Sequence, residues 1–259
     1  MSFIQTQELK VAYGDNVIIN NEKVAIDRGE ITAIIGPNGC GKSTMLKAIA
    51  RVIPYEGQVF IKDEDINIYS RKSLAKILSM LPQKPEGTIG LTVEELVAYG
   101  RHPYSKRFGG HSKEDLEKIK WAMKVTGISE FAKRQIDALS GGQKQRVWIA
   151  LCLSQDTEII FLDEPTTYLD IAHQLEILEI LKNLKEAHGK TIVMVLHDLN
   201  QASKYADKII ALKNGHTIKV GTSSEIINKD VLWELFGIEA EIIEDRQTKR
   251  PMCLSYSLK

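Results

Sequence analysis

The 259-residue chain has few cysteines, no net charge and no long apolar segment. Its three cysteines, Cys40, Cys152 and Cys253, lie far apart, so we expect neither a disulfide framework nor a cysteine metal site, and we expect a reducing compartment. Lysine plus arginine (34) balances aspartate plus glutamate (34). No global electrostatic field therefore points to nucleic acid or to acidic lipid.

No uncharged apolar run approaches the roughly 18 to 20 residues that span a bilayer. The N-terminal sequence MSFIQTQELK also lacks the basic start and apolar core of a signal peptide. We therefore expect a cytosolic protein, in which any membrane role comes through a partner. With 43% hydrophobic and 26% charged residues, the composition is ordinary for one large globular domain or two small ones.

Three short apolar runs are rich in isoleucine and valine and show no polar alternation: ITAIIG at 31–36, EIIFLDEP at 158–165 and TIVMVLHD at 191–198. This pattern is typical of strands buried on both faces of a parallel sheet. A buried helix segment is the alternative, but each run is too short for one. The sequence therefore predicts an α/β fold with a mainly parallel sheet.

Each run ends at residues that can carry chemistry, namely Gly36, the pair Asp163 and Glu164, and His197. In open α/β sheets, ligands bind in the crevice beyond the carboxyl ends of the strands. We therefore expect these three endings to converge on one binding crevice.

Other segments predict elements around this sheet. Four strand-like pieces indicate a small antiparallel sheet: LKVAYG, NVIINN, EKVAID and GQVFIKD. Capping-box patterns at Thr92–Glu95 and Ser112–Asp115 open amphipathic runs, which predicts an inserted helical subdomain at 84–157. The segment KIIALKNGHTIKVG predicts two strands joined by an Asn-Gly turn. The tail at 222–259 has two short helix-like pieces, followed by EIIED and MCLSYS around a polar turn, and we interpret it as a short extension of a single domain at 1–259.

The segment GPNGCGKST at 36–44 matches the pattern G-x-x-x-x-G-K-[ST], the P-loop. In this pattern, backbone N–H groups wrap the phosphates, the lysine reaches the β and γ phosphates, and the next hydroxyl ligates Mg²⁺. Lys42 and Ser43 take these two roles here. A chance match in a glycine-rich turn is the alternative, but the loop lies between a predicted strand and a helical run. We therefore predict nucleotide binding.

The acidic pair and the histidine fit phosphoryl transfer. A carboxylate at a strand end, such as Asp163, can hold Mg²⁺ directly or through water. Its neighbour Glu164 can orient and deprotonate the attacking water, and His197 can bond to the γ-phosphate. Each residue taken alone is more often an ordinary surface or packing residue. The P-loop in the same chain favours the catalytic interpretation.

A second glycine-rich segment, LSGGQKQR, begins at Leu139 and leads into a predicted helix. Ser140 has the position of an N-cap, and the glycines leave backbone N–H groups uncovered. The free donors and the partial positive charge of a helix start make an anion site. The chain therefore has two phosphate-binding segments that lie far apart in the sequence.

Together these motifs resemble the ATP-binding cassette (ABC) ATPases, for which LSGGQ followed by a basic helix is close to unique. The resemblance covers nearly the whole chain, in the family's motif order. It implies a P-loop NTPase core with an N-terminal antiparallel β subdomain and an inserted helical subdomain. It also implies that Gln83 lies in the loop joining core and subdomain and that Tyr13 stacks on adenine. An aromatic residue in a strand is otherwise more often only packed. The segment TTYLD at 166–170 matches the family's loop after the acidic strand end, and this loop ends at Asp170.

The resemblance assigns roles residue by residue. Glu164 and His197 are catalytic, and the metal ligands are Ser43, Gln83 and Asp163. The residues assigned to ATP binding are Tyr13, Gly36, Pro37, Asn38, Gly39, Cys40, Gly41, Lys42, Ser43, Thr44, Gln83, Ser140, Gly141, Gly142, Gln143 and Asp170. The implied cofactors are ATP and Mg²⁺, and the implied activity is ATP hydrolysis coupled to transport.

Cassettes of this family work as head-to-tail dimers, with ATP between the P-loop of one subunit and the LSGGQ of the other. The second phosphate grip therefore belongs to the nucleotide of a second copy. The chain resembles the separate ATPase subunit of an importer, bound at the cytoplasmic face of the membrane through permease subunits. An extracytoplasmic substrate-binding protein is the implied indirect partner.

Three phrases resemble the importer group for ferric siderophores, haem and vitamin B12: ELVAYGRHPY, TTYLDIAHQLEILEIL and LSGGQKQRVWIALCLSQ. Import of iron–siderophore complexes is the main interpretation, and zinc or manganese importers have similar phrases. Soluble ABC ATPases that act on nucleic acid typically carry two cassettes or long insertions. This chain has one cassette and balanced charge, so we expect no nucleic-acid partner. A binding switch without turnover would lack Glu164 or His197, and both are present.

Cys40 lies inside the P-loop, two residues before Lys42. A thiol at a helix N-terminus beside a lysine has a pKa below its usual value near 8.5. We therefore predict that Cys40 is the most reactive cysteine and that Mg-ATP protects it. Cys152 should be shielded in the helix after LSGGQ, and Cys253 should keep ordinary reactivity.

Overall fold

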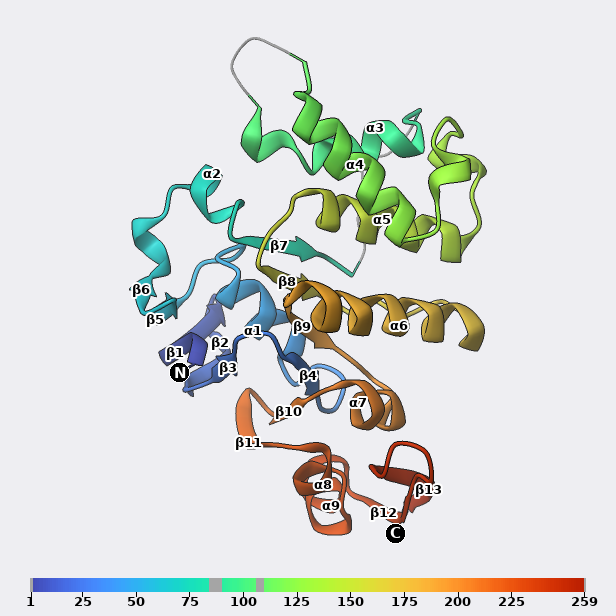
Figure 1. Cartoon of the computed structure of the whole chain (residues 1–259). Coiled ribbons are helices and arrows are strands. Elements are labelled where there is room, and N and C mark those ends of the chain that lie inside the picture. The colour runs from blue at the N-terminus through green and yellow to red at the C-terminus, as the bar shows by residue number, and fades with distance from the viewer. Residues whose placement is uncertain (1, 84–89, 106–109, 259) are drawn as a thin grey trace. The chain divides into compact units, whose positions relative to one another are not determined.

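The computed structural model describes three stretches of the chain: residues 2–83, 90–105 and 110–258. Backbone contacts divide the chain into two units, whose elements are labelled in Figure 1. The first unit is Met1–Ile68 together with Thr191–Lys259, and the second is Tyr69–Lys190. In the described stretches, no helix has both the length and the apolar character needed to cross a bilayer.

An antiparallel sheet in the first unit is organised around its first strand. Its strands are β1 (Ser2–Tyr13), β2 (Asn16–Glu22), β3 (Ala25–Asp27), β5 (Glu56–Ile61) and β6 (Glu64–Asp65). β1 pairs antiparallel with β2, β3 and β5, which confirms the predicted sheet. β1 begins well before the predicted LKVAYG. The missed part contains a buried polar residue, Thr6, whose hydroxyl bonds to the backbone of Glu22 and Val24.

A second sheet in the first unit contains mainly parallel strands. In spatial order they are β11 (His216–Gly221), β10 (Lys208–Lys213), β4 (Ile31–Ile35) and β9 (Thr191–Val195). β4 is parallel to both β9 and β10, and every residue of β4 and β9 is buried, as predicted. β10 and β11 form the predicted hairpin through Asn214 and Gly215.

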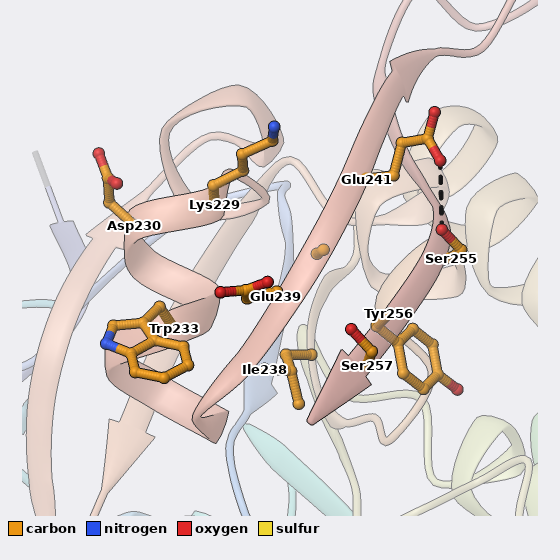
Figure 2. Close-up of a pocket in the computed structure, with 10 residues that line it drawn as sticks. Lys229, Asp230, Trp233, Ile238, Glu239, Glu241, Ser255, Tyr256 and Ser257 are labelled. Carbon is orange, nitrogen blue, oxygen red and sulfur yellow. Dashed lines mark hydrogen bonds between the residues drawn. The ribbon is translucent and has the colours of Figure 1, made fainter. Parts of the chain in front are cut away.

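The first unit also contains α-helices and a C-terminal hairpin. They are α1 (Lys42–Ile49), α7 (Leu199–Tyr205), α8 (Ser223–Ile226), α9 (Lys229–Phe236), β12 (Ile238–Glu244) and β13 (Pro251–Leu258). Asn200 of α7 holds the hairpin, because its Oδ1 accepts from the N–H of Cys253 at 2.8 Å and its Nδ2 donates to the carbonyl of Cys253 at 3.1 Å. A cavity of about 690 Å³ lies between α9 and the hairpin (Figure 2). None of the ten residues that line it is a predicted site residue.

In its described residues, the second unit combines two parallel strands with five α-helices. They are β7 (Leu78–Leu81), β8 (Ile159–Leu162), α2 (Arg71–Leu74), α3 (Val93–Tyr99), α4 (Lys113–Val125), α5 (Gly141–Ser154) and α6 (Ile171–His188). All four residues of β8 are buried, as predicted. Both predicted capping boxes are present, at Thr92–Glu95 for α3 and Ser112–Asp115 for α4.

The predicted helical subdomain at 84–157 lies within this second unit. Its helices α3, α4 and α5 pack against one another. Residues 84–89 and 106–109 of the predicted range lie outside the described residues. The unit also includes β7 and all of α6, which lie outside 84–157, so the boundaries of the subdomain remain a prediction.

A buried ion pair joins the start of α4 to the end of α5. Arg101 is 2% exposed, its Nε donates to Asp115 Oδ1 at 2.7 Å, and its Nη1 donates to the carbonyl of Ser154 at 2.9 Å. Burial opposes ionisation of Asp115, but hydrogen bonds from Arg101 and Ser112 outweigh it and lower the pKa of this carboxyl to about 2. The pair is therefore charged at neutral pH, and it anchors the helix that begins with LSGGQ.

Candidate functional site

The loop GPNGCGKST connects β4 to α1, and two of its positions require glycine. A Cβ on Gly36 would lie 2.0 Å from the carbonyl oxygen of Leu212 in β10. Gly41 has a φ of 104°, and a Cβ there would lie 2.7 Å from the Ile19 side chain. Any other residue at these positions would displace neighbouring atoms or strain the backbone. The glycines at these two positions are therefore required by the local packing.

Lys42 is the first residue of α1 and is only 5% exposed. Its ammonium donates hydrogen bonds of 2.9 Å to the carbonyl oxygens of Gly36 and Pro37. This places a positive charge inside the loop, beside the N-terminal N–H groups of a helix, which favour an anion. Ser43 and Thr44 follow on the first turn of α1. The loop thus has the donors and the charge of a phosphate cradle.

Two further predicted residues belong to the first unit. Tyr13 ends β1 and is 56% exposed, so its ring is accessible to a planar ligand. His197 is exposed and follows β9 by two residues. Since β4 and β9 are parallel neighbours, His197 and Gly36 follow adjacent strand ends at one edge of the sheet. The third predicted ending, at Asp163 and Glu164, belongs to the second unit, so convergence of all three remains a prediction.

The predicted lowering of the Cys40 pKa is wrong. Cys40 is 4% exposed, and its Sγ lies 2.9 Å from where a Cβ of Gly36 would be. Burial raises the pKa of the thiol, although the charge of Lys42 and nearby backbone N–H groups act in the opposite direction. That Cys40 is labelled before the other cysteines, and that Mg-ATP protects it, stay predictions.

The other two cysteines are also buried. Cys152 is 1% exposed, and burial raises the pKa of its thiol to about 12, which confirms that it is shielded. Cys253 is 6% exposed within the C-terminal hairpin, and burial raises its pKa as well. The expectation that Cys253 keeps ordinary reactivity is therefore wrong.

Asp163 and Glu164 directly follow β8 in the second unit, where the structure brings Glu164 together with Gln83. Asp163 is 1% exposed. Glu164 has a φ of 56°, which is uncommon outside glycine. Its Oε2 accepts a hydrogen bond of 2.6 Å from Gln83 Nε2 and one of 3.0 Å from Thr167 Oγ1. A strained backbone at a tightly held carboxylate is typical of a functional position.

Ser140 is the N-cap of α5, as predicted, because its hydroxyl accepts from the N–H of Gln143 at 3.3 Å. The N–H of Ser140 in turn donates to Gln143 Oε1 at 3.0 Å, which completes a capping box. The spacing S-x-x-Q carries the signal for this box, whereas only the cap was predicted from the sequence. Ser140 and Gly141 are exposed, so the start of α5 is accessible to a ligand.

Gln145 of α5 and His173 of α6, which the sequence did not single out, contact the loop after β8. Gln145 Nε2 of α5 donates to the carbonyl of Pro165 at 2.9 Å. Asp170 is the N-cap of α6, and its Oδ1 accepts a hydrogen bond of 2.9 Å from the backbone N–H of His173. The ring Nδ1 of His173 lies 2.7 Å from the same oxygen. These two interactions lower the pKa of the Asp170 carboxyl. The His173 ring also packs against Gly142, where a Cβ would lie 2.6 Å from it.

This packing predicts a stability difference between the two signature glycines. Gly142→Ala should make the protein about 1–2 kcal/mol less stable than Gly141→Ala, because the new methyl group pushes His173 away from Asp170. Gly141 is the matched control, since a Cβ there meets nothing within 4 Å. Urea unfolding of both variants measures the difference. Combining each variant with His173→Ala should remove it, and an unchanged difference would show that the ring is not the obstacle.

The oxygen donors of the predicted metal site suit Mg²⁺. Among the described residues, no group of three or more His, Cys, Asp or Glu side chains is arranged to hold a metal ion. Mg²⁺ needs no such cage, because one or two protein carboxylates, waters and substrate phosphates hold it. Asp163 offers a buried carboxylate and Ser43 a hydroxyl in the loop. Gln83 directs its Nε2 to Glu164, so Oε1 is the amide atom that could bind a metal ion.

Comparisons with known proteins identify the family. The ABC transporter family model matches residues 19–167. The chain is 50% identical over 259 residues to the iron(3+)-hydroxamate import ATP-binding protein FhuC of Bacillus subtilis (strain 168), covering 100% of this chain and 96% of that protein. It is 42% identical over 250 residues to the ferric enterobactin transport ATP-binding protein FepC of Escherichia coli (strain K12), covering 96% and 92%.

The fold is similar to a dimeric, post-hydrolysis structure of the ATP-binding cassette MJ0796 bound to ADP and Pi. The TM-score is 0.73 at 32% identity, covering 85% of this chain and 98% of that chain. These similarities confirm the predicted P-loop NTPase fold and the family resemblance. The chain therefore belongs to the ABC transporter family, in which it is an ATP-binding cassette that hydrolyses ATP.

Proposed function

We propose that this chain is the ATP-hydrolysing subunit of a membrane importer for iron–siderophore complexes. The observation that carries the proposal is the full-length similarity to import proteins whose names specify ferric hydroxamate and ferric enterobactin. Importers of zinc, manganese, haem or vitamin B12 are the alternative within the same class. A soluble ABC ATPase acting on nucleic acid is not supported, because acidic and basic side chains balance at 34 each.

The residues divide the chemistry of ATP hydrolysis among them. Tyr13 stacks on adenine, and the loop 36–44 wraps the phosphates, with Lys42 countering the charge of the β and γ phosphates. Glu164 takes a proton from water while the water oxygen attacks the γ-phosphorus and the bond to the bridging oxygen breaks. ADP leaves with that bridging oxygen, and His197 orients the γ-phosphate by a hydrogen bond.

Ser43, Gln83 and Asp163 would hold Mg²⁺ through a hydroxyl, an amide oxygen and a carboxylate. When bound, the ion neutralises charge on the β and γ phosphates. Asp163 is suited to this role because a buried carboxylate requires a compensating cation or donor. In this proposal Asp163 binds the metal ion, and the adjacent Glu164 accepts the proton.

The active form in the proposal is a head-to-tail homodimer. Ser140, Gly141, Gly142 and Gln143 offer the N–H groups and dipole of the start of α5 to the nucleotide held by a second copy. The accessible start of α5 and the dimeric ADP-bound relative support this assignment. ATP bridges the copies, and hydrolysis removes the bridge.

The cargo pathway belongs to separate permease subunits in this proposal. The cassette is peripheral, at the cytoplasmic face of the membrane, and an extracytoplasmic binding protein delivers the cargo to the permease. The import function named for the relatives supports this arrangement. Closure of the homodimer on ATP supplies the movement that the permease uses.

Uptake measurements in the native host test the proposed cargo. Deleting the gene should reduce uptake of ferric hydroxamates or ferric catecholates and leave uptake of haem, vitamin B12, Zn²⁺ and Mn²⁺ unchanged. The wild-type gene should restore uptake, and a Lys42→Ala gene, which lacks the phosphate-binding charge, should not. Loss of uptake of one of the other cargoes, with ferric siderophore uptake intact, would contradict the proposal.

A further inference from the structure

Two side chains hold one oxygen of the Glu164 carboxylate. Gln83 Nε2 donates to Oε2 at 2.6 Å, and Thr167 Oγ1 donates to the same atom at 3.0 Å. A carboxylate oxygen has two lone pairs, so these two donors use the accepting capacity of Oε2. The bonds also restrain the terminal torsion of the side chain, which is otherwise broad.

The backbone around Glu164 places Thr167 beside it. Glu164 has a φ of 56°, and the N–H of Thr167 donates to the Glu164 carbonyl at 3.3 Å across a turn. Within this turn, the carbonyl of Pro165 accepts from Gln145 of α5 at 2.9 Å. The turn is therefore held by its own backbone bond and by the helix that begins with LSGGQ. This leaves the Thr167 hydroxyl directed back to the carboxylate.

We propose that Thr167 is a positioning residue for ATP hydrolysis, which holds Glu164 so that Oε1 accepts the proton of the attacking water. The inference rests on the proposed role of Glu164 as the base. In the reaction, Oε1 gains the proton and Glu164 becomes a carboxylic acid. The water oxygen bonds to the γ-phosphorus as the bond to the bridging oxygen breaks, giving ADP and inorganic phosphate. Thr167 acts only through the carboxylate.

The expected effect is on the chemical step. A carboxylate that can turn presents its oxygens in several orientations, and a misplacement of about 1 Å costs roughly a hundredfold in rate. When the Thr167 hydrogen bond is lost, Gln83 still holds the carboxylate. The fall in kcat should therefore be smaller than the fall expected for a fully misplaced carboxylate. Binding of ATP does not use the base, so kcat should fall without a matching change in affinity.

The test compares two substitutions that differ in the hydroxyl. Thr167→Val should lower kcat by about tenfold or more, with the Kd for ATP changed by less than about twofold. Thr167→Ser keeps the donor and should retain at least about half of the wild-type kcat. Thr217→Val is the matched control, because Thr217 Oγ1 has no hydrogen-bond partner among the described residues. Its kcat should equal that of the wild type.

A second comparison separates positioning from a merely structural role. In a Glu164→Gln chain, adding Thr167→Val should leave ATP-dependent dimer formation and residual turnover unchanged, because the base is already absent. Normal kcat in Thr167→Val, equal losses in the valine and serine variants, or loss of the dimer in the double variant would each overturn the inference. Normal turnover in Glu164→Gln would instead refute the proposed role of Glu164 itself.

Discussion

Replacing Glu164 by glutamine should lower ATP turnover by at least about a hundredfold, within the range of roughly 10² to 10⁴ for a positioned general base. Glutamine keeps the size of the side chain but cannot take the proton from water. Nucleotide binding does not need the base, so the variant should accumulate as an ATP-bound dimer. Phosphate release measures the turnover, and light scattering with and without ATP measures the dimer.

Glu186→Gln is the matched control for this experiment. Glu186 is exposed on α6, away from the loop after β8 in the sequence, and its substitution removes the same charge. It should turn over like the wild type and should not form a stable dimer. A Glu164→Gln chain that hydrolyses ATP at the normal rate, or that stays monomeric with ATP, would refute the assignment of the base.

Ser140→Arg should remove turnover and ATP-dependent dimer formation while sparing nucleotide binding. Arginine takes away the acceptor for the N–H of Gln143 and places a bulky cation at the start of α5. The loop at 36–44 of the same chain is untouched. Titration with a fluorescent nucleotide, together with phosphate release, separates these two effects.

Ser112→Arg controls for the loss of a cap, because Ser112 forms the equivalent capping box of α4. We expect it to lower stability by about 1 kcal/mol and to keep ATPase activity. If Ser140→Arg abolishes nucleotide binding by the monomer, then α5 serves the nucleotide of its own chain, and the picture of a site shared between two copies is wrong.

Features that depend on neighbouring residues in the sequence were predictable. The buried strands β4, β8 and β9 follow from uninterrupted apolar runs, since a strand covered on both faces has no polar alternation. The boxes that begin α3 and α4 follow from the three-residue spacing between a hydroxyl and an acid. The boxes join groups three residues apart, and each apolar run is a pattern of a few consecutive residues.

Cys40 shows where local reasoning fails. A helix start and an adjacent lysine both lower the pKa of a thiol, and these effects are present in the structure. The side chain is nevertheless buried, and its Sγ lies 2.9 Å from where a Cβ of Gly36 would be. Desolvation then outweighs the local effects. The residue pattern of the loop does not reveal this burial.

The contacts around Glu164 could not be predicted for a different reason. The catalytic interpretation of Glu164 came from its place after a buried strand, but Gln83 reaches it from 81 residues away. Gln145 reaches Pro165 across 20 residues from another helix. Such contacts depend on how separate segments meet in the fold. The type of residue at the site was therefore predictable, whereas the groups that orient it were not.

Mixing two disabled chains tests most directly whether ATP is held between the loop of one copy and α5 of another. One chain carries Ser140→Arg and the other Lys42→Ala, and both carry Glu164→Gln to stall hydrolysis. Neither chain alone should dimerise with ATP, whereas the mixture should form a heterodimer with one intact site, detected by energy transfer between labelled chains. A mixture that stays monomeric with ATP, or a Ser140→Arg chain that dimerises by itself, would contradict the shared site.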